Sequence, residues 1–396
     1  MKQFGGTALV ACRVVLASFT VSCATTESPA RGPGSVAARA AAPEVEWTAA
    51  VAYAARGAIE RIRCGRPDAA DPRLQAVSVD QAGDVALVHF GEHGPRAEVL
   101  YRNGVELTGL VLADVDAAEP GVEIYVGGYQ RGPNGEEAGG IVLQLVVTSG
   151  ANGGVRVRTI YTGPAFVHSI EFVEPQPTDG GAGLLVSTYA GEVHRLAPNA
   201  TGPWRDELLH REPPSADAEA LKVKDAAFLR DPDGRPRHTA FIALKTGRLV
   251  CLDLDRPGAA RVVHEEPGGL SRITPDADGG AYVTGYSGRL LHFTRDGDGF
   301  RFDVLDQEGV DSGLRGVVLG DFPAANTTAH FAVFGFHKKC RALVTRAGVL
   351  DPVTLFVDSE RGHTIEAGDF VPDNDADELL VGGYSKQVTL LVARRR

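Results

Sequence analysis

The chain has 396 residues, of which 43% are hydrophobic and 23% charged, and this balance excludes a wholly disordered protein. Glycine (48) and proline (23) supply 71 of the 396 residues, an enrichment that, without a Gly-X-Y period, excludes collagen and favours many tight turns between short strands. Forty Lys and Arg residues against 51 Asp and Glu residues give a net charge of −11, which disfavours nucleic acid and anionic membrane surfaces as partners.

The first 22 residues have the features of an export signal. Lys2 precedes an apolar stretch, residues 8–22, that is interrupted only by Arg13 and is too short to span a bilayer. The small residues before Cys23 resemble the bacterial lipoprotein processing site, where a cysteine becomes diacylated. We therefore predict a signal peptide over residues 1–22 and lipidation at Cys23, with a plain secretory signal as the alternative.

Residues 23–44 are rich in Ala, Gly, Pro and Ser, a composition typical of a flexible tether. We expect residues 45–396 to form one domain. Its three cysteines, Cys64, Cys251 and Cys340, are far apart in sequence and odd in number, which argues against a disulfide scaffold and favours small buried residues.

A repeat of four short strands runs through this domain. Its two clearest copies are residues 111–129 and 365–384, each of which ends in Val-Gly-Gly-Tyr. Weaker copies end at residues 185–189, 282–286 and 332–336. Alternating strands separated by Gly, Asp and Pro turns, in units of about 45–50 residues, are typical of a β-propeller.

The expected innermost strands begin near Ala58, Leu107, Val167, Lys224, Leu270, Leu314 and Gly362. The last copy stops after its third strand near Leu391, and residues 45–53 resemble a missing fourth strand. Pairing these two segments would remove an open sheet edge. We therefore predict an all-β, seven-bladed propeller with four strands per blade, closed by the N-terminal strand; six or eight blades are the alternatives.

One segment resembles a known repeat family. Gly368-Asp369-Phe370, followed by Asp-Asn-Asp-Ala-Asp-Glu-Leu-Leu-Val-Gly at residues 373–382, is similar to the FG-GAP repeat and to its relative, the VCBS repeat. Those repeats build the seven-bladed propellers of integrin-α-like proteins and of many exported bacterial proteins. The resemblance extends over roughly residues 45–393 and is clearest in the last blade.

The resemblance implies a calcium site in the loop between the first two strands of the last blade. Calcium takes six to eight oxygen ligands, and alternate positions of a tight loop converge on one point. Asp369, Asp373 and Asp377 stand at the first, fifth and ninth positions, whereas Val371 replaces the third ligand and Asp375 is placed to compensate. We predict structural calcium here, with a solvated acidic turn as the alternative.

Polar residues mark the entrances of the innermost strands. His168 and His363 stand in near-identical contexts, Val-His-Ser-Ile-Glu and Gly-His-Thr-Ile-Glu, in the third and seventh blades. The other expected equivalents are Thr108, Asp225, Ser271 and Arg315. Because this chemistry differs between blades, we predict a funnel that binds a polar ligand or a metal held by the two histidines; hydrated strand ends are the alternative. Strict alternation places His168 and Glu171 on opposite sides of their strand.

Aromatic residues recur at the turn between the second and third strands of five blades: Tyr129, Tyr189, Tyr286, Phe336 and Tyr384. Basic residues follow some of these turns, namely His337, Lys338, Lys339 and Lys386. In a propeller this turn and the entrance of the innermost strand share one face. Aromatic platforms beside charged groups suit sugars or acidic protein loops, although packing alone would also repeat an aromatic residue.

Common catalytic motifs are missing from the sequence: it contains no GxSxG, HExxH or P-loop pattern. We predict an exported, lipid-anchored, monomeric binding module for a cell-envelope protein or a glycan, with no nucleic-acid partner and membrane contact only through the lipid. The alternative is an extracytoplasmic polysaccharide lyase or hydrolase that uses the same funnel, because fold alone does not decide between them. The predicted ligand-binding residues are His168, Asp225, Arg315, His337, Lys338, His363, Tyr189, Tyr286, Tyr384 and Lys386.

Overall fold

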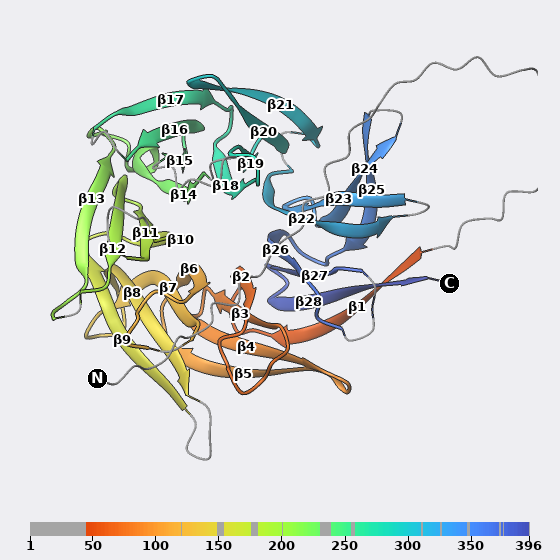
Figure 1. Ribbon diagram of the computed structural model, residues 1–396, viewed down its shortest axis with the longest axis horizontal. Helices are drawn as coiled ribbons and strands as arrows, with labels where there is room; N and C mark the ends of the chain where they lie inside the picture. The colour runs from red at the N-terminus through yellow and green to blue at the C-terminus, as the bar shows by residue number, and fades with distance from the viewer. Residues whose placement is uncertain are drawn as a thin grey trace, which may run out of the picture. The chain divides into compact units, whose positions relative to one another are not determined.

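The structure is a computed structural model that describes residues 45–395 except 120, 149–153, 176–180, 200, 230–238, 255–257, 310–311, 325–326, 347–348, 372–373 and 375. Its strands form seven antiparallel sheets of four strands each, arranged around a central axis (Figure 1). The predicted all-β, seven-bladed propeller is therefore confirmed. The predicted signal peptide, the tether and Cys23 lie outside the described residues. No helix in the described ranges is long and apolar enough to cross a membrane.

Each of the first six blades is built from four consecutive strands. The first blade consists of β2 (Ile59–Gly65), β3 (Gln75–Asp80), β4 (Asp84–Gly91) and β5 (Gly94–Arg102). The second consists of β6 (Leu107–Ala113), β7 (Glu123–Arg131), β8 (Glu137–Thr148) and β9 (Gly154–Gly163). The third consists of β10 (Val167–Val173), β11 (Gly183–Thr188), β12 (Glu192–Ala197) and β13 (Arg205–Arg211). The fourth blade consists of β14 (Val223–Phe228), β15 (Thr239–Leu244), β16 (Arg248–Asp253) and β17 (Ala260–Glu265). The fifth consists of β18 (Leu270–Pro275), β19 (Ala281–Gly285), β20 (Arg289–Asp296) and β21 (Gly299–Gln307). The sixth consists of β22 (Leu314–Ala324), β23 (Thr327–Gly335), β24 (Lys339–Arg346) and β25 (Val349–Val357). A single 3-10 turn, η1 (Ala218–Leu221), is the only helical element within these described ranges.

The seventh blade joins the two ends of the domain. It consists of β26 (Gly362–Gly368), β27 (Glu378–Gly383), β28 (Gln387–Arg395) and β1 (Val45–Ala54). β1 pairs antiparallel with β28, with Trp47 opposite Ala393, and Trp47 Nε1 also donates a hydrogen bond to the Pro323 carbonyl at 3.0 Å. The predicted closure of the ring by the N-terminal strand is therefore confirmed, and Trp47 ties it to the sixth blade.

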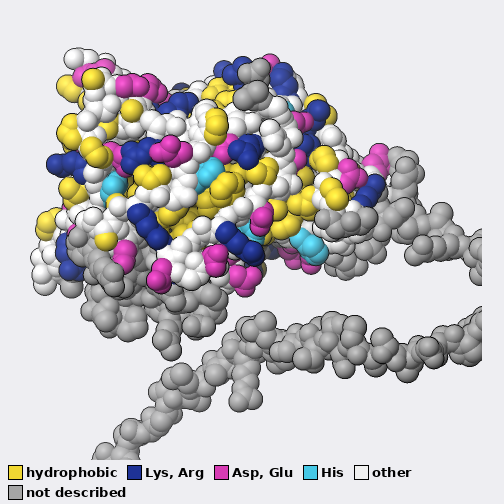
Figure 2. All heavy atoms as spheres, turned by 90° about the horizontal axis from the view of Figure 1, so that it is seen from above, with side chains coloured by type: hydrophobic (Ala, Val, Ile, Leu, Met, Phe, Trp, Pro, Cys, Tyr) yellow, Lys and Arg dark blue, Asp and Glu magenta, His cyan; other side chains and the backbone are white. Residues whose placement is uncertain are grey.

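The core lies between the faces of neighbouring blades. Alternating apolar residues of adjacent sheets pack against each other, as Ile59 and Val88 of the first blade do with Leu380 and Val388 of the seventh. Cys251 and Cys340 are buried and free, as expected, and Cys64 is free and half-buried. The outermost strands are more exposed, and on the side in Figure 2 basic, acidic and apolar side chains are interspersed. Burial therefore increases toward the axis.

A bulge interrupts every innermost strand at its second residue. The register shifts there in all seven blades, at Glu60, Thr108, His168, Lys224, Ser271, Arg315 and His363. A bulge places two successive residues opposite a single residue of the partner strand and changes the direction of a side chain. Successive side chains therefore do not strictly alternate between the two faces of the sheet at this point. β14 begins at Val223, so Lys224 and not Asp225 is the true equivalent of His168, and Asp225 is one residue further along the strand.

Candidate functional site in the central channel

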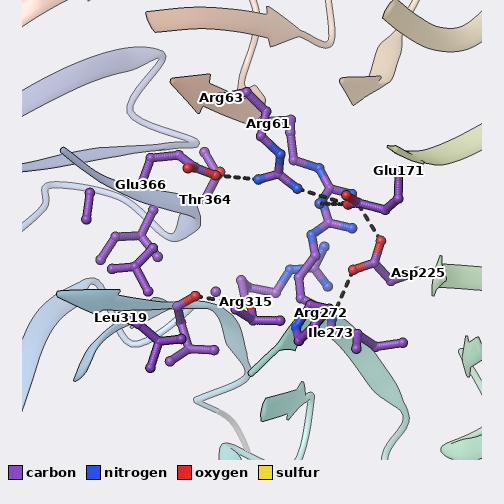
Figure 3. Close-up of a pocket in the computed structure, with 17 residues that line it drawn as sticks. Arg61, Arg63, Glu171, Asp225, Arg272, Ile273, Arg315, Leu319, Thr364 and Glu366 are labelled. Atoms are coloured by element: carbon purple, nitrogen blue, oxygen red, sulfur yellow. Dashed lines mark hydrogen bonds and ion pairs between the residues drawn. The ribbon is translucent and has the colours of Figure 1, made fainter. Parts of the chain in front are cut away.

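Ion pairs between blades that are not neighbours cross the channel. Arg61 of β2 places Nη2 3.3 Å from Oδ1 of Asp225 on β14. Arg63, two residues later, pairs with Glu366 of β26 and, at 3.0 Å, with Glu171 of β10 (Figure 3). All five side chains are buried or half-buried. These pairs form a charged layer across the axis of the ring.

Two further arginines in this layer have no carboxylate partner in the described part of the chain. Arg272 donates from Nη1 to the Lys224 carbonyl at 3.2 Å, and Arg315 donates from Nη2 to Nε2 of His363 at 2.6 Å. Nη2 of Arg272 and both Nε and Nη1 of Arg315 are buried without a hydrogen-bond partner, in residues only 5% and 3% exposed. Burial, together with nearby Arg61 and Arg315, lowers the pKa of Arg272 to about 9. The layer therefore contains buried guanidinium donors that have no acceptor, although the buried carboxylate of Glu60 lies nearby, 3.2 Å from Nδ1 of His363.

His168 and His363 make the same contact in their two blades. Nδ1 of His168 lies 2.7 Å from the Lys224 carbonyl oxygen, and Nδ1 of His363 lies 3.1 Å from that of Glu60. A carbonyl oxygen only accepts, so each imidazole carries its proton on Nδ1. Burial, and then nearby cations, lower the pKa of both well below the usual value. Each neutral histidine thus links its blade to the next blade in the ring.

The predicted aromatic positions surround the end of the channel where the innermost strands begin. In every blade the residue at this turn donates its backbone N–H to the carbonyl just before the innermost strand, as Tyr189 does to Phe166 and Tyr384 to Arg361. The seven residues so placed are Gln81, Tyr129, Tyr189, Lys245, Tyr286, Phe336 and Tyr384. We call these seven residues the entrance ring. Tyr384 is 40% exposed, and the other aromatic members are half-buried.

Cations lie directly against the rings of the entrance ring. Lys245 Nζ is 3.7 Å from the ring centroid of Tyr286, and Lys224 Nζ donates to Oη of Tyr189 at 2.7 Å. Arg315 lies over Tyr286 and Phe336, at 4.9 Å and 5.1 Å from their centroids. Such cation–π contacts are stronger where water is excluded. Aromatic and basic groups therefore share one face, and Arg315 connects that face to the charged layer.

The basic segment after Phe336 has partners of its own. Nε2 of His337 lies 2.8 Å from Glu308, and Lys338 donates from Nζ to the Ser359 carbonyl at 2.7 Å. The His337 contact joins the sixth blade to the fifth, and the Lys338 contact holds the turn against the loop after β25. Lys386, the corresponding residue of the seventh blade, is exposed. The structure thus gives His337 and Lys338 structural contacts, and their predicted ligand binding stays a prediction.

A cavity of about 330 Å³ lies on the other side of the charged layer from the entrance ring, near the ends of the innermost strands. Its charged wall consists of Arg61, Arg63, Glu171, Asp225, Arg272, Arg315 and Glu366, and its apolar wall of Ile273, Pro275, Val317, Val318, Leu319, Ile365 and Ala367 (Figure 3). Of the predicted ligand-binding residues, only Asp225 and Arg315 line it. Arg61, Arg63 and Arg272 were not predicted, although each is a charged residue within a buried strand, as in the Ile-Glu-Arg-Ile-Arg segment that begins at Ile59.

The predicted calcium loop is described only in part, because Asp373 and Asp375 lie outside the described residues. Asp377 accepts a hydrogen bond from the Asp321 backbone at 3.0 Å, and Asp369 is exposed. Glu378, which the sequence did not single out, accepts the backbone N–H groups that follow Asp369 at 2.7 and 3.1 Å. No group of three His, Cys, Asp or Glu residues in the described ranges is arranged to hold a metal. Calcium binding therefore stays a prediction.

No protein-family model matches the chain, and no curated protein matches it. Among solved structures, the WD40 β-propeller domain of Doa1 superposes with a TM-score of 0.60 at 13% identity, covering 89% of this chain and 97% of that one. Virginiamycin B lyase from Staphylococcus aureus superposes with a TM-score of 0.56 at 10% identity, covering 88% and 99%. At such identities the likeness shows the propeller fold alone, which is consistent with a binding module or with an enzyme. The FG-GAP and VCBS resemblance stays a prediction.

Proposed function

We propose that this protein is a binding module for a cell-envelope protein or a glycan and that the entrance ring is its contact surface. The observation that carries the proposal is the ring of partly exposed aromatic side chains with cations directly against them. Tyr286 lies between Lys245 and Arg315, and Lys222 Nζ is 4.7 Å from the ring of Tyr189. Aromatic faces and edges give large contact areas at low entropic cost, and the cations favour an acidic partner.

The chemistry of the entrance ring favours acidic sugars or acidic protein loops. A pyranose ring presents apolar C–H groups to an aromatic face, while a uronic acid or an aspartate would reach the neighbouring lysines. The exported, lipid-anchored location that we propose for the module rests on the signal-like residues 1–22 and on Cys23. We propose that it acts as a monomer.

One observation favours the enzymatic alternative, a polysaccharide lyase or hydrolase. Glu106 immediately precedes β6, and its carbonyl accepts the N–H of Tyr129, so it lies at the entrance. Burial, and then the charges of Glu60 and Glu137, raise its pKa to about 7. A carboxyl group that titrates near neutrality is suited to general acid–base work. Release of reducing ends from acidic polysaccharides, abolished in Glu106→Gln, would support this alternative.

The binding proposal is tested by calorimetric titration with acidic oligosaccharides and with envelope glycan fragments. We expect saturable binding that a Tyr286→Ala/Tyr384→Ala variant weakens by more than tenfold. Phe302→Ala removes an exposed aromatic side chain from the outer strand β21 and should leave affinity unchanged. Equal weakening in both variants, or none in the entrance variant, would contradict the proposal.

A further inference from the structure

The cavity beyond the charged layer has the features of a second binding site. We propose that it binds an organic carboxylate with an apolar body, the carboxylate contacting Arg272 and Arg315 and the apolar part resting against β22 and β18. The cavity and the entrance ring lie on opposite sides of the charged layer. The two sites share Arg315, which also lies over Tyr286 and Phe336, whereas Arg272 and Leu319 line the cavity and are not members of the entrance ring.

The carboxylates that line the cavity are already paired, whereas some of its guanidinium nitrogens are not. Asp225 already accepts from Arg61 and, at 3.0 Å, from the backbone N–H of Ile273. Glu366 and Glu171 are both engaged by Arg63, so the carboxylates that line the cavity already have cationic partners. Three N–H-bearing nitrogens of Arg272 and Arg315 remain buried without a partner. Buried N–H donors without an acceptor are costly, and an anion in the cavity would remove that cost.

The unpaired donors have the right shape for a carboxylate. A guanidinium group presents its N–H donors as a planar fork that matches the two oxygens of a carboxylate. Arg272 and Arg315 come from neighbouring blades, line the same cavity and each keep at least one nitrogen unpaired. Figure 3 shows both side chains extending to the same part of the cavity. One carboxylate could therefore accept hydrogen bonds from two arginines.

The cavity also has an apolar wall. Ile273 and Pro275 from β18, and Val317 and Leu319 from β22, line the cavity and come from the same two strands as Arg272 and Arg315. Leu319 is 41% exposed, so this wall reaches the protein surface and offers a way in. A volume of about 330 Å³ is at the lower end for small-molecule sites. A short hydrocarbon or aromatic body attached to the carboxylate fits this combination better than an inorganic anion does.

The test is isothermal titration of the protein with acetate, butyrate, hexanoate and octanoate at constant ionic strength. We expect one saturable site for octanoate, with affinity that increases by up to about fourfold for each buried methylene. Octanol, which lacks the anion, should bind at least tenfold more weakly than octanoate. Equal affinity for acetate and octanoate, equal affinity for octanol and octanoate, or no saturable octanoate binding would overturn the proposal.

Variants locate the site. Arg272→Gln and Arg315→Gln should each weaken octanoate binding at least tenfold, while Arg301→Gln, on the outer strand β21 of the same blade as Arg272, should not. Leu319→Asp places a repelling charge at the exposed rim and is expected to weaken octanoate binding in a folded protein, as checked by circular dichroism. Unchanged binding in Leu319→Asp, or in a folded arginine variant, would show that the ligand binds elsewhere and would overturn the inference.

Discussion

Arg315 donates a hydrogen bond to Nε2 of His363 at 2.6 Å, while Nδ1 of the same imidazole faces the Glu60 carbonyl at 3.1 Å. The contact series runs from the sixth blade through the seventh to the first, across the seam where the ring closes. It requires a neutral imidazole, because a protonated histidine has no lone pair to accept from Arg315. The closure of the ring at its axis is thereby coupled to one protonation state.

Acid should therefore destabilise the fold through His363. The pKa of its imidazole in the unfolded chain is near 6.5, and burial and cations hold the folded value well below that. As pH falls below 6.5 the unfolded chain gains a proton that the folded chain does not, so stability is lost. His363→Gln should show a flatter decline in urea stability between pH 6.5 and 5. His330→Gln, at an exposed site, should keep the wild-type slope, and the same slope in His363→Gln would contradict this account.

Glu106 should make the stability of the fold decrease as pH rises, opposite to the effect of His363. Burial, followed by the charges of Glu60 and Glu137, raises its pKa from 4.5 to about 7. Between these pH values the unfolded chain has released a proton that the folded chain keeps, so stability declines as pH rises from 4.5 to 7. The full shift corresponds to about 3 kcal/mol, and because the side chain is partly exposed we expect about 1 kcal/mol.

Glu106→Gln should therefore unfold at higher urea concentration than the wild type at pH 8 and at a similar concentration at pH 4. Glu92→Gln, an exposed change in the first blade, is the matched control and should have no effect at either pH. A stability gain in Glu106→Gln that is as large at pH 4 as at pH 8 would show that its cause is not ionisation.

The repeat determined how much of the fold the sequence could predict. Turn glycines and alternating strands recur in every blade, so the seven innermost strands were placed to within about one residue, and residues 45–53 were recognised as the closing strand. The bulges were not predicted, because an extra residue leaves the hydrophobic spacing of the remaining strand intact. The strict alternation that placed His168 and Glu171 on opposite sides of their strand is interrupted by the bulge at His168, and Glu171 lines the cavity.

The charged layer could be predicted only in part. Polar residues at strand entrances pointed to Asp225 and Arg315 of the layer, and to His168 and His363, of which His363 accepts a hydrogen bond from Arg315. Arg61 was missed because its partner Asp225 is 164 residues away, and no local pattern relates two residues that meet across the axis of a ring. In a propeller the strand order fixes which blades are adjacent, but side-chain length and the bulge decide which charges meet across the channel.

Calcium binding in the last blade is tested by chelation. If Asp369 and Asp377 hold calcium together with Asp373 and Asp375, then excess EDTA should lower the melting temperature, because a ligand that binds only the folded chain stabilises it. Calcium, but not magnesium, should restore the original value. Asp369→Asn should remove the response, whereas Asp351→Asn in the sixth blade should not. An identical transition with EDTA and with calcium would exclude the site.

Two turns hold lysine where other blades have glycine. Lys338 and Lys386 have φ values of 67° and 61°, whereas their equivalents Gly191 and Gly247 have 81° and 96°. A left-handed backbone costs a non-glycine residue about 1 kcal/mol, so Lys386→Gly should stabilise the fold by about that amount. Gly247→Ala should destabilise it by more, because the new Cβ would lie 1.8 Å from the Glu266 carbonyl oxygen. Thermal melts of the two variants should therefore shift in opposite directions, and a lower melting temperature in Lys386→Gly would contradict the strain argument.

The closing strand itself provides the most direct test of the ring. Ala55 donates its N–H to the Lys386 carbonyl at 2.8 Å, as Glu266 does to Gly247 within the fourth blade, so β1 serves as a true fourth strand. A chain lacking residues 1–54 would leave the backbone groups of β28 unpaired along an open edge, and such edges aggregate. We expect this chain to melt at lower temperature and to self-associate in sedimentation analysis, whereas a chain lacking only residues 1–44 should do neither. A synthetic peptide of residues 45–54 should restore both properties, because it supplies the missing strand; a monomeric truncated chain with an unchanged melting temperature would show that the seam is closed by contacts other than β1.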